Sequence, residues 1–265
     1  MKLFSFQQML YVLFCTLIAN NACASPYELS LAKEITLLGA GTAMGVTGYL
    51  AEHRQKSPTI EQLNTLDKNK IPAIDRNFVH PLNTTISRTS DVLLLGAMAT
   101  PGIFALKKQH DFMTISVMYA ETLLLAGGAM TLAKGSITRF RPYAYEQSTP
   151  LNIRTSVDSQ RSFFSGHATL ASASLLFSAT LYSDYYPDSS LKNTVWGAAI
   201  GGSLIVAGLR VAGGDHFPTD VLTGFACGSA IGYLVPAWHR KKKSVRLMPY
   251  LQNKTIGLLL QTSFP

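Results

Sequence analysis

The feature that most constrains this chain is a series of apolar stretches of helical length that carry almost no charge. Each stretch is rich in Leu, Ala, Gly and Ser, a composition typical of helices that pack closely against one another. The stretches are residues 35–51, 92–106, 113–133, 168–182, 194–212 and 221–238. The sequence therefore predicts an all-α fold, a membrane-embedded bundle of five to six helices.

The amino-acid composition supports a membrane location and limits the classes of molecule that the protein is expected to bind. Charged residues make up only 14% of the 265 residues, whereas soluble domains average about 25%. Some stretches are shorter than the roughly 20 residues that cross a hydrocarbon core, so a soluble bundle of buried helices stays open as an alternative. Glu121 lies inside the third stretch and requires an interior partner in either case. The net charge of +8 suits lipid headgroups or phosphorylated substrates, and no basic-aromatic pattern indicates nucleic acid.

Residues 1–24 are typical of a cleavable signal peptide. Lys2 supplies the charged start, residues 9–19 the apolar region, and residues 22–24 a small-residue cleavage site. An uncleaved anchor helix is the alternative. Cleavage after residue 24 leaves Cys227 as the remaining cysteine, which excludes an intramolecular disulfide in the mature chain.

Two basic clusters orient the bundle. Lys107 and Lys108 follow the second stretch, and residues 239–243 follow the sixth. If the second to sixth stretches all cross, both clusters lie on one side, which the positive-inside rule makes cytoplasmic. The other side is then the periplasm of a bacterial cell, beyond its inner membrane. A cleaved leader leaves the mature N-terminus outside, which fits five spans, so we expect residues 35–51 not to cross completely.

The chain divides into four parts. After the signal peptide, residues 25–90 are expected to hold an N-terminal helix and an external polar connection. Residues 91–240 form the helical bundle, and residues 241–265 a basic tail whose alternation is compatible with a hairpin. Nothing in the sequence indicates the oligomeric state.

The first chemical motif, KGSITRFRP, ends the third stretch. Lys134 and Arg141 are seven residues apart and share one helix face if the helix persists, and Pro142 would end it. Two cations that converge at a helix end suit a phosphate. A membrane-interface anchor explains the same residues equally well when they stand alone.

The second motif is Ser165-Gly166-His167, where the fourth helix begins. Ser is a good N-cap, Gly allows close backbone approach, and the free N–H groups of a helix N-terminus attract an anion. His167 would stand beside that anion as a proton donor. Plain helix capping with a hydrogen-bonded histidine is the simpler interpretation of the triplet in isolation.

The third motif, LRVAGGDHFPTD, supplies Arg210, His216 and Asp220. Pro218 fits the first turn of a helix, which places His216 at its mouth and Asp220 one turn further. A carboxylate that accepts the Nδ1 proton leaves Nε2 free as a nucleophile. The alternative is a carboxylate that stabilises the helix dipole and pairs with Arg210.

Two other kinds of site are disfavoured. His167, His216, Asp215 and Asp220 offer metal-ligating atoms, but three nearby cations would crowd a divalent ion, and no metal-ligand spacing is present. Ser165 lacks the G-x-S-x-G pattern of a serine hydrolase.

Taken together, the order K-x6-RP, SGH, R-x5-H-x3-D resembles the type-2 phosphatidic acid phosphatase superfamily over about residues 90–240. That superfamily includes membrane lipid phosphatases, soluble bacterial acid phosphatases and vanadium haloperoxidases. The resemblance implies a helical bundle in which the motifs meet at one end, here the periplasmic end, and no metal or cofactor.

By position, the resemblance makes His216 the nucleophile that forms a phosphohistidine, with Asp220 orienting it. It makes His167 the acid that protonates the leaving oxygen and later activates water. The phosphoryl oxygens would be held by Lys134, Arg141, Ser165, Gly166 and Arg210. The implied activity is hydrolysis of a lipid phosphate monoester or pyrophosphate.

Two positions depart from the family pattern. Phe164 stands where proline is common, and Leu209 where a serine usually precedes the arginine. Loss of that hydroxyl removes one neutral donor, worth about 1 kcal/mol. The alternatives are a broad-specificity periplasmic acid phosphatase and a membrane protein that binds phospholipid without catalysis. Binding alone needs cations but no oriented pair of histidines, which disfavours the last.

Overall fold

The computed structural model describes residues 25–241, 244–252 and 255–263. Residues 27–240 make up one compact unit, and the described residues 244–252 and 255–263 belong to a second, smaller one. The predicted signal peptide lies outside the described residues.

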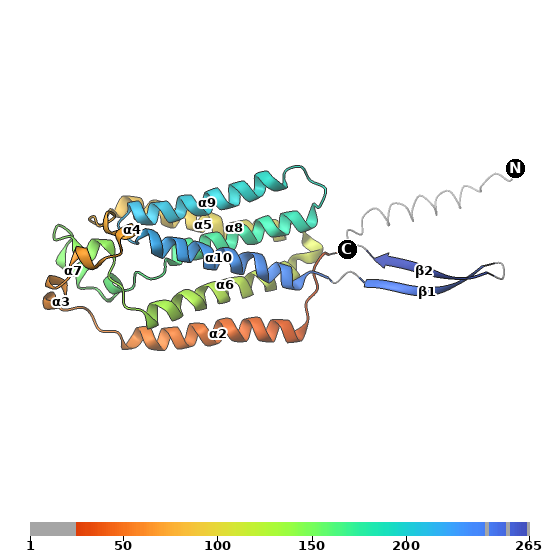
Figure 1. Ribbon diagram of the computed structural model, residues 1–265, viewed down its shortest axis with the longest axis horizontal. Coiled ribbons are helices and arrows are strands. Elements are labelled where there is room, and N and C mark those ends of the chain that lie inside the picture. The colour runs from red at the N-terminus through yellow and green to blue at the C-terminus, as the bar shows by residue number, and fades with distance from the viewer. Residues whose placement is uncertain (1–24, 242–243, 253–254, 264–265) are drawn as a thin grey trace. The chain divides into compact units, whose positions relative to one another are not determined.

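Six long helices build the larger unit, and each contains one of the apolar stretches (Figure 1). They are α2 (Leu31–Arg54), α5 (Thr84–Lys107), α6 (Phe112–Ser136), α8 (Gly166–Tyr185), α9 (Lys192–Ala212) and α10 (Pro218–His239). Shorter helices connect them: α3 (Ile60–Asn64), η1 (Lys68–Lys70), α4 (Ala73–Arg76), η2 (Gln109–Asp111), η3 (Pro142–Tyr145), α7 (Leu151–Arg154) and η4 (Val157–Gln160). The prediction of an all-helical bundle is confirmed for this unit.

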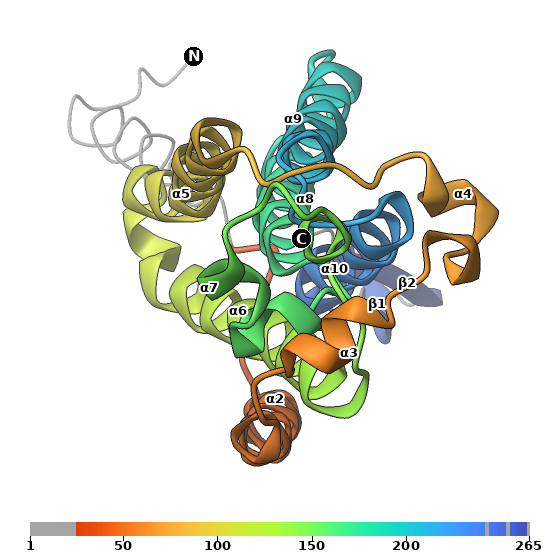
Figure 2. The same ribbon diagram turned by 90° about the vertical axis from the view of Figure 1, so that its left-hand side faces the viewer.

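The short helices α3, α4 and α7 gather at one end of the bundle (Figures 1 and 2). At the same end α6 finishes and α8 and α10 begin. We call it the motif end, because all three sequence motifs lie there, and we call the other the far end.

Helix α8 occupies the centre of the bundle, packed against α5, α6, α9 and α10 (Figure 2). Ala168, Phe177 and Leu181 on α8 are fully buried. Helix α10 approaches α8 at backbone distance, because a Cβ atom on Gly228 would overlap the carbonyl oxygen of Thr169. This close contact fixes the starts of α8 and α10, which carry the second and third motifs, against each other.

Four helical segments are long and apolar enough to cross a membrane: residues 84–107, 109–136, 192–212 and 218–239. The bundle is therefore a membrane protein by its helix composition. Helix α8, which we expected to be a fifth span, is not among them. Its Ser- and Thr-containing surface faces the other helices, so it does not need the hydropathy of a lipid-facing helix.

Helix α2, which contains the residues 35–51 that we expected not to cross completely, is likewise not among these four segments. It is a continuous helix of 24 residues, about 36 Å long at 1.5 Å per residue. Near its start, the backbone N–H of Glu28 donates to the carbonyl of His239 at the far end. Beyond its last residue, Gln55 donates to the carbonyl of Lys134 at the motif end, over 2.7 Å. Helix α2 thus runs the whole length of the bundle.

The contact between α2 and α6 explains this course. Gly41 and Gly48 on α2 face the backbone of α6, and Gly128 and Gly135 on α6 face the backbone of α2. A Cβ atom at any of the four would overlap the opposite helix. Small residues at such spacing allow helices to pack closely in a membrane, which the apolar count alone did not reveal.

Two boundaries are refined. Helix α5 begins at Thr84, capped by the side chain of Asn83, so the bundle starts earlier than the expected residue 91. In the smaller unit, β1 (Ser244–Gln252) pairs antiparallel with β2 (Thr255–Ser263), with Gln252 opposite Thr255.

Candidate active site

Arg141 reaches the site by a different route from the one expected. Helix α6 ends at Ser136, so Lys134 and Arg141 do not share a helix face. The chain continues in extended form, and the backbone N–H of Arg141 donates to the carbonyl of Ser159 over 2.8 Å. Pro142 therefore begins η3 and does not end α6. The spacing still brings both cations to the motif end, because the extended segment folds back over the bundle.

His216 is the most enclosed group of the third motif, with 1% of its surface exposed. Its Nδ1 lies 2.8 Å from the carbonyl oxygen of Ser162, an acceptor that only an N–H can satisfy. The neutral ring therefore carries its lone pair on Nε2. That atom faces Nη1 of Arg141, 3.3 Å away.

The surroundings of His216 favour its neutral form. Burial, followed by the positive charges of Arg141, Lys134 and Arg210, lowers the pKa of His216 well below its ordinary value. The imidazole thus stays neutral at pH values at which an exposed histidine begins to take up a proton. The same interactions show that the three cations of the first and third motifs surround this ring.

Asp220 does not hold the Nδ1 hydrogen bond that we expected it to accept. Its nearest carboxylate oxygen is 3.8 Å from Nδ1 of His216. Instead it accepts from the hydroxyl of Ser162 over 2.5 Å and from the backbone N–H of Phe217 over 2.9 Å. It also pairs with Arg139. Asp220 thus positions the segment whose carbonyl binds His216, and acts on the ring through Ser162.

Arg210 is buried and linked to two carboxylates. Its Nη2 lies 2.7 Å from Asp215, and its Nη1 lies 3.4 Å from Asp91. Its Nε is buried and has no hydrogen-bond partner. Arg141 is paired in the same way with Asp158, over 2.9 Å. Both guanidinium groups are therefore balanced by aspartates.

The second motif forms as its sequence indicates. Ser165 is the N-cap of α8 and accepts from the backbone N–H of Ala168. A Cβ atom on Gly166 would overlap the sulfur of Met130, so a larger residue there requires this side chain to move. Nε2 of His167 lies 2.7 Å from the carboxylate of Asp91. His167 is also within electrostatic range of Arg210 and Lys134.

The structure thus brings together all eight residues that the motifs singled out, around the mouths of α8 and α10. Sequence reasoning missed the carboxylates that accompany them: Asp75, Asp91, Asp158 and Asp215 act as ion-pair partners, together with Arg139. Asp215 had a signal, since it stands directly before His216. The others lie far away in the chain and had none.

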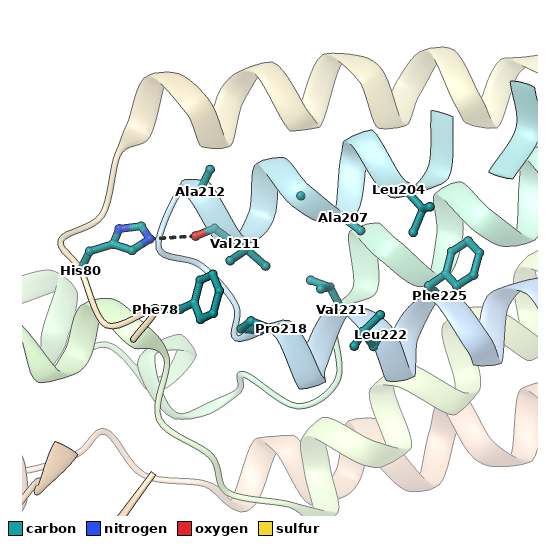
Figure 3. Close-up of a pocket in the computed structure, with 11 residues that line it drawn as sticks. Phe78, His80, Leu204, Ala207, Val211, Ala212, Pro218, Val221, Leu222 and Phe225 are labelled. Atoms are coloured by element: carbon teal, nitrogen blue, oxygen red, sulfur yellow. Dashed lines mark hydrogen bonds between the residues drawn. The ribbon is translucent and has the colours of Figure 1, made fainter. Parts of the chain in front are cut away.

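Two apolar grooves flank the site. The first, about 520 Å³, lies between α9 and α10 and is lined by Gly208, Val211 and Val221 (Figure 3). His80 closes its end, with Nε2 2.9 Å from the carbonyl of Val211. The second, about 480 Å³, lies between α5 and α9 and is lined by Val92, Gly96 and Ile205 among others. One of its lining residues, Val92, follows Asp91, the partner of His167, in the chain.

Comparison with known proteins identifies the helical region. No curated protein matches the chain significantly. Among solved structures, the chain is similar to the "first transmembrane PAP2 type phosphatidylglycerolphosphate phosphatase from Bacillus subtilis". The identity is 20%, over 87% of this chain and 94% of the other, with a TM-score of 0.41. A TM-score this low is no evidence for a shared substrate. The PAP2 superfamily model matches residues 116–244, which contain all three motifs, and this region of the chain therefore belongs to the PAP2 superfamily.

Proposed function

We propose that this protein is a metal-independent phosphatase that hydrolyses a lipid phosphate monoester or pyrophosphate through a phosphohistidine intermediate. Membership of a phosphatase family supports the reaction class. The observation that carries the proposal is the position of His216: its Nε2 carries a lone pair and is surrounded by the cations of two motifs.

In the first step, Nε2 of His216 forms a bond to phosphorus while the bond from phosphorus to the leaving oxygen breaks. The carbonyl of Ser162 accepts the Nδ1 proton and stabilises the positive charge that develops on the ring. Arg141 donates to Nε2 in the free protein. We expect it to turn to a phosphoryl oxygen, because a guanidinium binds a phosphate more strongly than a neutral imidazole.

His167 is placed to handle the leaving group. We expect the ring to give a proton to the leaving oxygen once the negative charge of a bound phosphate offsets the nearby cations, with the carboxylate of Asp91 holding Nε2 in place. The neutral ring then takes a proton from the water that attacks the phosphohistidine, which releases inorganic phosphate and restores Nε2. Ser165, the Gly166 N–H, Lys134 and Arg210 complete the set of phosphate donors.

The position of His167 indicates which of the two grooves binds the lipid tail. The tail belongs to the leaving alcohol, which departs on the side of His167 and its partner Asp91. The groove between α5 and α9 includes Val92, the residue after Asp91, and is lined by apolar groups of helices long and apolar enough to cross a membrane. We therefore propose that the hydrocarbon chain lies against Val92, Gly96 and Ile205.

Two glycines provide a matched test of this assignment. Gly96 lines the α5/α9 groove and Gly208 the α9/α10 groove, and each has open space where a side chain would grow. Gly96→Phe is expected to lower kcat/KM for a long-chain lipid phosphate at least about tenfold, since it displaces several buried CH₂ groups worth about 0.8 kcal/mol each. Release of phosphate from p-nitrophenyl phosphate is expected to change little.

Gly208→Phe is the control and is expected to leave both substrates unaffected. The measurement is phosphate release by purified protein from a panel of lipid phosphates in EDTA. If Gly208→Phe alone discriminates against the lipid, the tail lies in the other groove. If short water-soluble phosphates are hydrolysed as well as any lipid, the broad-specificity acid phosphatase is the correct function.

We propose that the motif end faces the periplasm. Lys107, Lys108 and Arg240 lie at the far end, which the positive-inside rule makes cytoplasmic. Because α2 runs the length of the bundle, Tyr27 then lies on the cytoplasmic side, paired with Arg240. A cut after residue 24 by a periplasmic peptidase is not compatible with this arrangement.

The protein isolated from bacterial membranes is accordingly expected to retain residues 1–24. Intact mass spectrometry checks this directly, and a mass that includes residues 1–24 would replace the predicted cleavable signal peptide with an uncleaved leader. A mature chain beginning at Ser25 would contradict the periplasmic orientation or the crossing of α2. An accessibility assay on single cysteines introduced at the two ends would then decide between them.

A further inference from the structure

The far end of the bundle holds a second cluster of ionisable groups, away from the phosphate site. Glu34 on α2, Glu121 on α6 and His239 on α10 place one ligand atom each within 4.8 Å of the others. Glu121 and His239 are fully buried, and the side chain of Glu34 is 14% exposed. Three helices thus converge on these side chains in the interior of the bundle.

The separations fit a metal ion. Nε2 of His239 lies 3.2 Å from Oε1 of Glu34 and 3.4 Å from Oε2 of Glu121. Ligands about 2.0–2.2 Å from a tetrahedral zinc ion are roughly 3.4 Å apart. Both separations from Nε2 therefore match the edges of a tetrahedron around zinc, and the two carboxylates lie within 4.8 Å of each other. A fourth position is left for water.

The histidine is already in the form that binds a metal. Its Nδ1 lies 2.8 Å from the carbonyl oxygen of Val235, so the N–H is on Nδ1 and the lone pair of the neutral ring is on Nε2. A backbone carbonyl in this position is the usual outer partner of a metal-bound histidine. Glu34 is held in a similar way, since its Oε1 accepts the backbone N–H of Ser30 over 3.1 Å.

The charges of the three side chains also favour a bound metal ion. Both carboxylate oxygens of Glu121 are buried and have no hydrogen-bond partner, and an unpaired carboxylate inside a membrane bundle is strongly unfavourable. Protonation of His239 balances one of the two carboxylates and leaves the other. A divalent cation with a neutral imidazole balances both.

We propose that Glu34, Glu121 and His239 bind a divalent transition metal ion, with zinc the best fit to one imidazole nitrogen and two carboxylate oxygens. The ion links α2 and α10 through α6. Within the described residues the extensive contacts of α2 are with α6, so the ion ties this outer helix to the rest of the bundle. The site is structural and takes no part in phosphate hydrolysis.

The test uses the full-length protein, purified with a tag that contains no histidine and stripped with EDTA. Addition of Zn²⁺ is expected to restore one bound ion per chain and to raise the thermal unfolding midpoint. Co²⁺ is expected to give the visible absorption bands of a low-symmetry, four-coordinate site. Phosphate release is measured on the stripped protein as well, so that a failure of metal binding is distinguished from a failure of the phosphatase proposal.

Glu34→Gln, Glu121→Gln and His239→Gln are each expected to weaken Zn²⁺ binding by more than the roughly 10–100-fold lost with an outer partner. Glu34→Gln matters most, because this partly exposed side chain is replaced without disturbing the core. Glu28→Gln and His110→Gln are the controls, being exposed residues outside the cluster. Absence of stoichiometric Zn²⁺ binding by the parent protein, or equal binding by all three variants, would overturn the proposal.

Discussion

His216→Ala is expected to reduce phosphate release by on the order of 10⁴-fold or more, the scale seen when a catalytic nucleophile is removed. The substitution deletes the Nε2 atom that forms the bond to phosphorus, and no other described side chain occupies its position beside Arg141. Substrate binding is expected to weaken far less, since the cations remain. The measurement is phosphate release under single-turnover conditions together with a binding assay for the lipid.

His53→Ala is the control for this variant, because His53 is exposed on α2 and belongs to neither cluster. It should retain the parent rate. If His216→Ala hydrolysed the substrate at a rate near that of the parent, the site would act by direct attack of water, and His216 would only bind phosphate.

Asp220→Ala is expected to lower the free energy of unfolding by about 3–5 kcal/mol, the cost of breaking one side of a buried ion pair. The change leaves Arg139 without this partner, and it removes the acceptor of the Ser162 hydroxyl and the Phe217 N–H. Thermal unfolding in detergent measures the loss. Asp220→Asn, which keeps the shape and an acceptor, should lose less.

These two variants separate the roles of the third motif. His216→Ala should remove activity and lower the unfolding midpoint less than Asp220→Ala does, because no ion pair is broken. A stable but inactive Asp220→Ala protein would show that the carboxylate acts on the imidazole itself. That result would indicate that Asp220 accepts a hydrogen bond directly from Nδ1 of His216 in the working enzyme, although the two groups are 3.8 Å apart in the structure.

The sequence predicted those parts of the site that depend only on residues close together in the chain, such as helix starts. Ser165 caps α8 and Pro218 opens α10, because N-cap and first-turn preferences depend on a few neighbouring residues. Helix periodicity no longer applies once the chain leaves the helix. For this reason it wrongly predicted that Arg141 shares a helix face with Lys134. Seven residues match two helical turns, and nothing in that count reveals an end at Ser136.

Hydrogen-bond and ion-pair partners that lie far apart in the sequence could not be predicted in this way. The acceptor for Nδ1 of His216 is the carbonyl of Ser162, and every residue type offers a carbonyl. Asp91 reaches His167 across 76 positions of sequence. Glu121 was the informative exception, since a carboxylate in an apolar stretch requires an interior partner, and the structure supplies His239.

The most direct test of the central claim is to trap the covalent intermediate. His167→Ala protein is mixed with a substrate that carries a radiolabelled phosphate and a good leaving group, and is quenched in alkali, where phosphohistidine is stable. The account predicts that label accumulates on the peptide containing His216, because hydrolysis of the intermediate lacks its base. Label must also be absent from the His216→Ala, His167→Ala double variant. Label that persists in the double variant, or turnover without any protein-bound label, would contradict the mechanism.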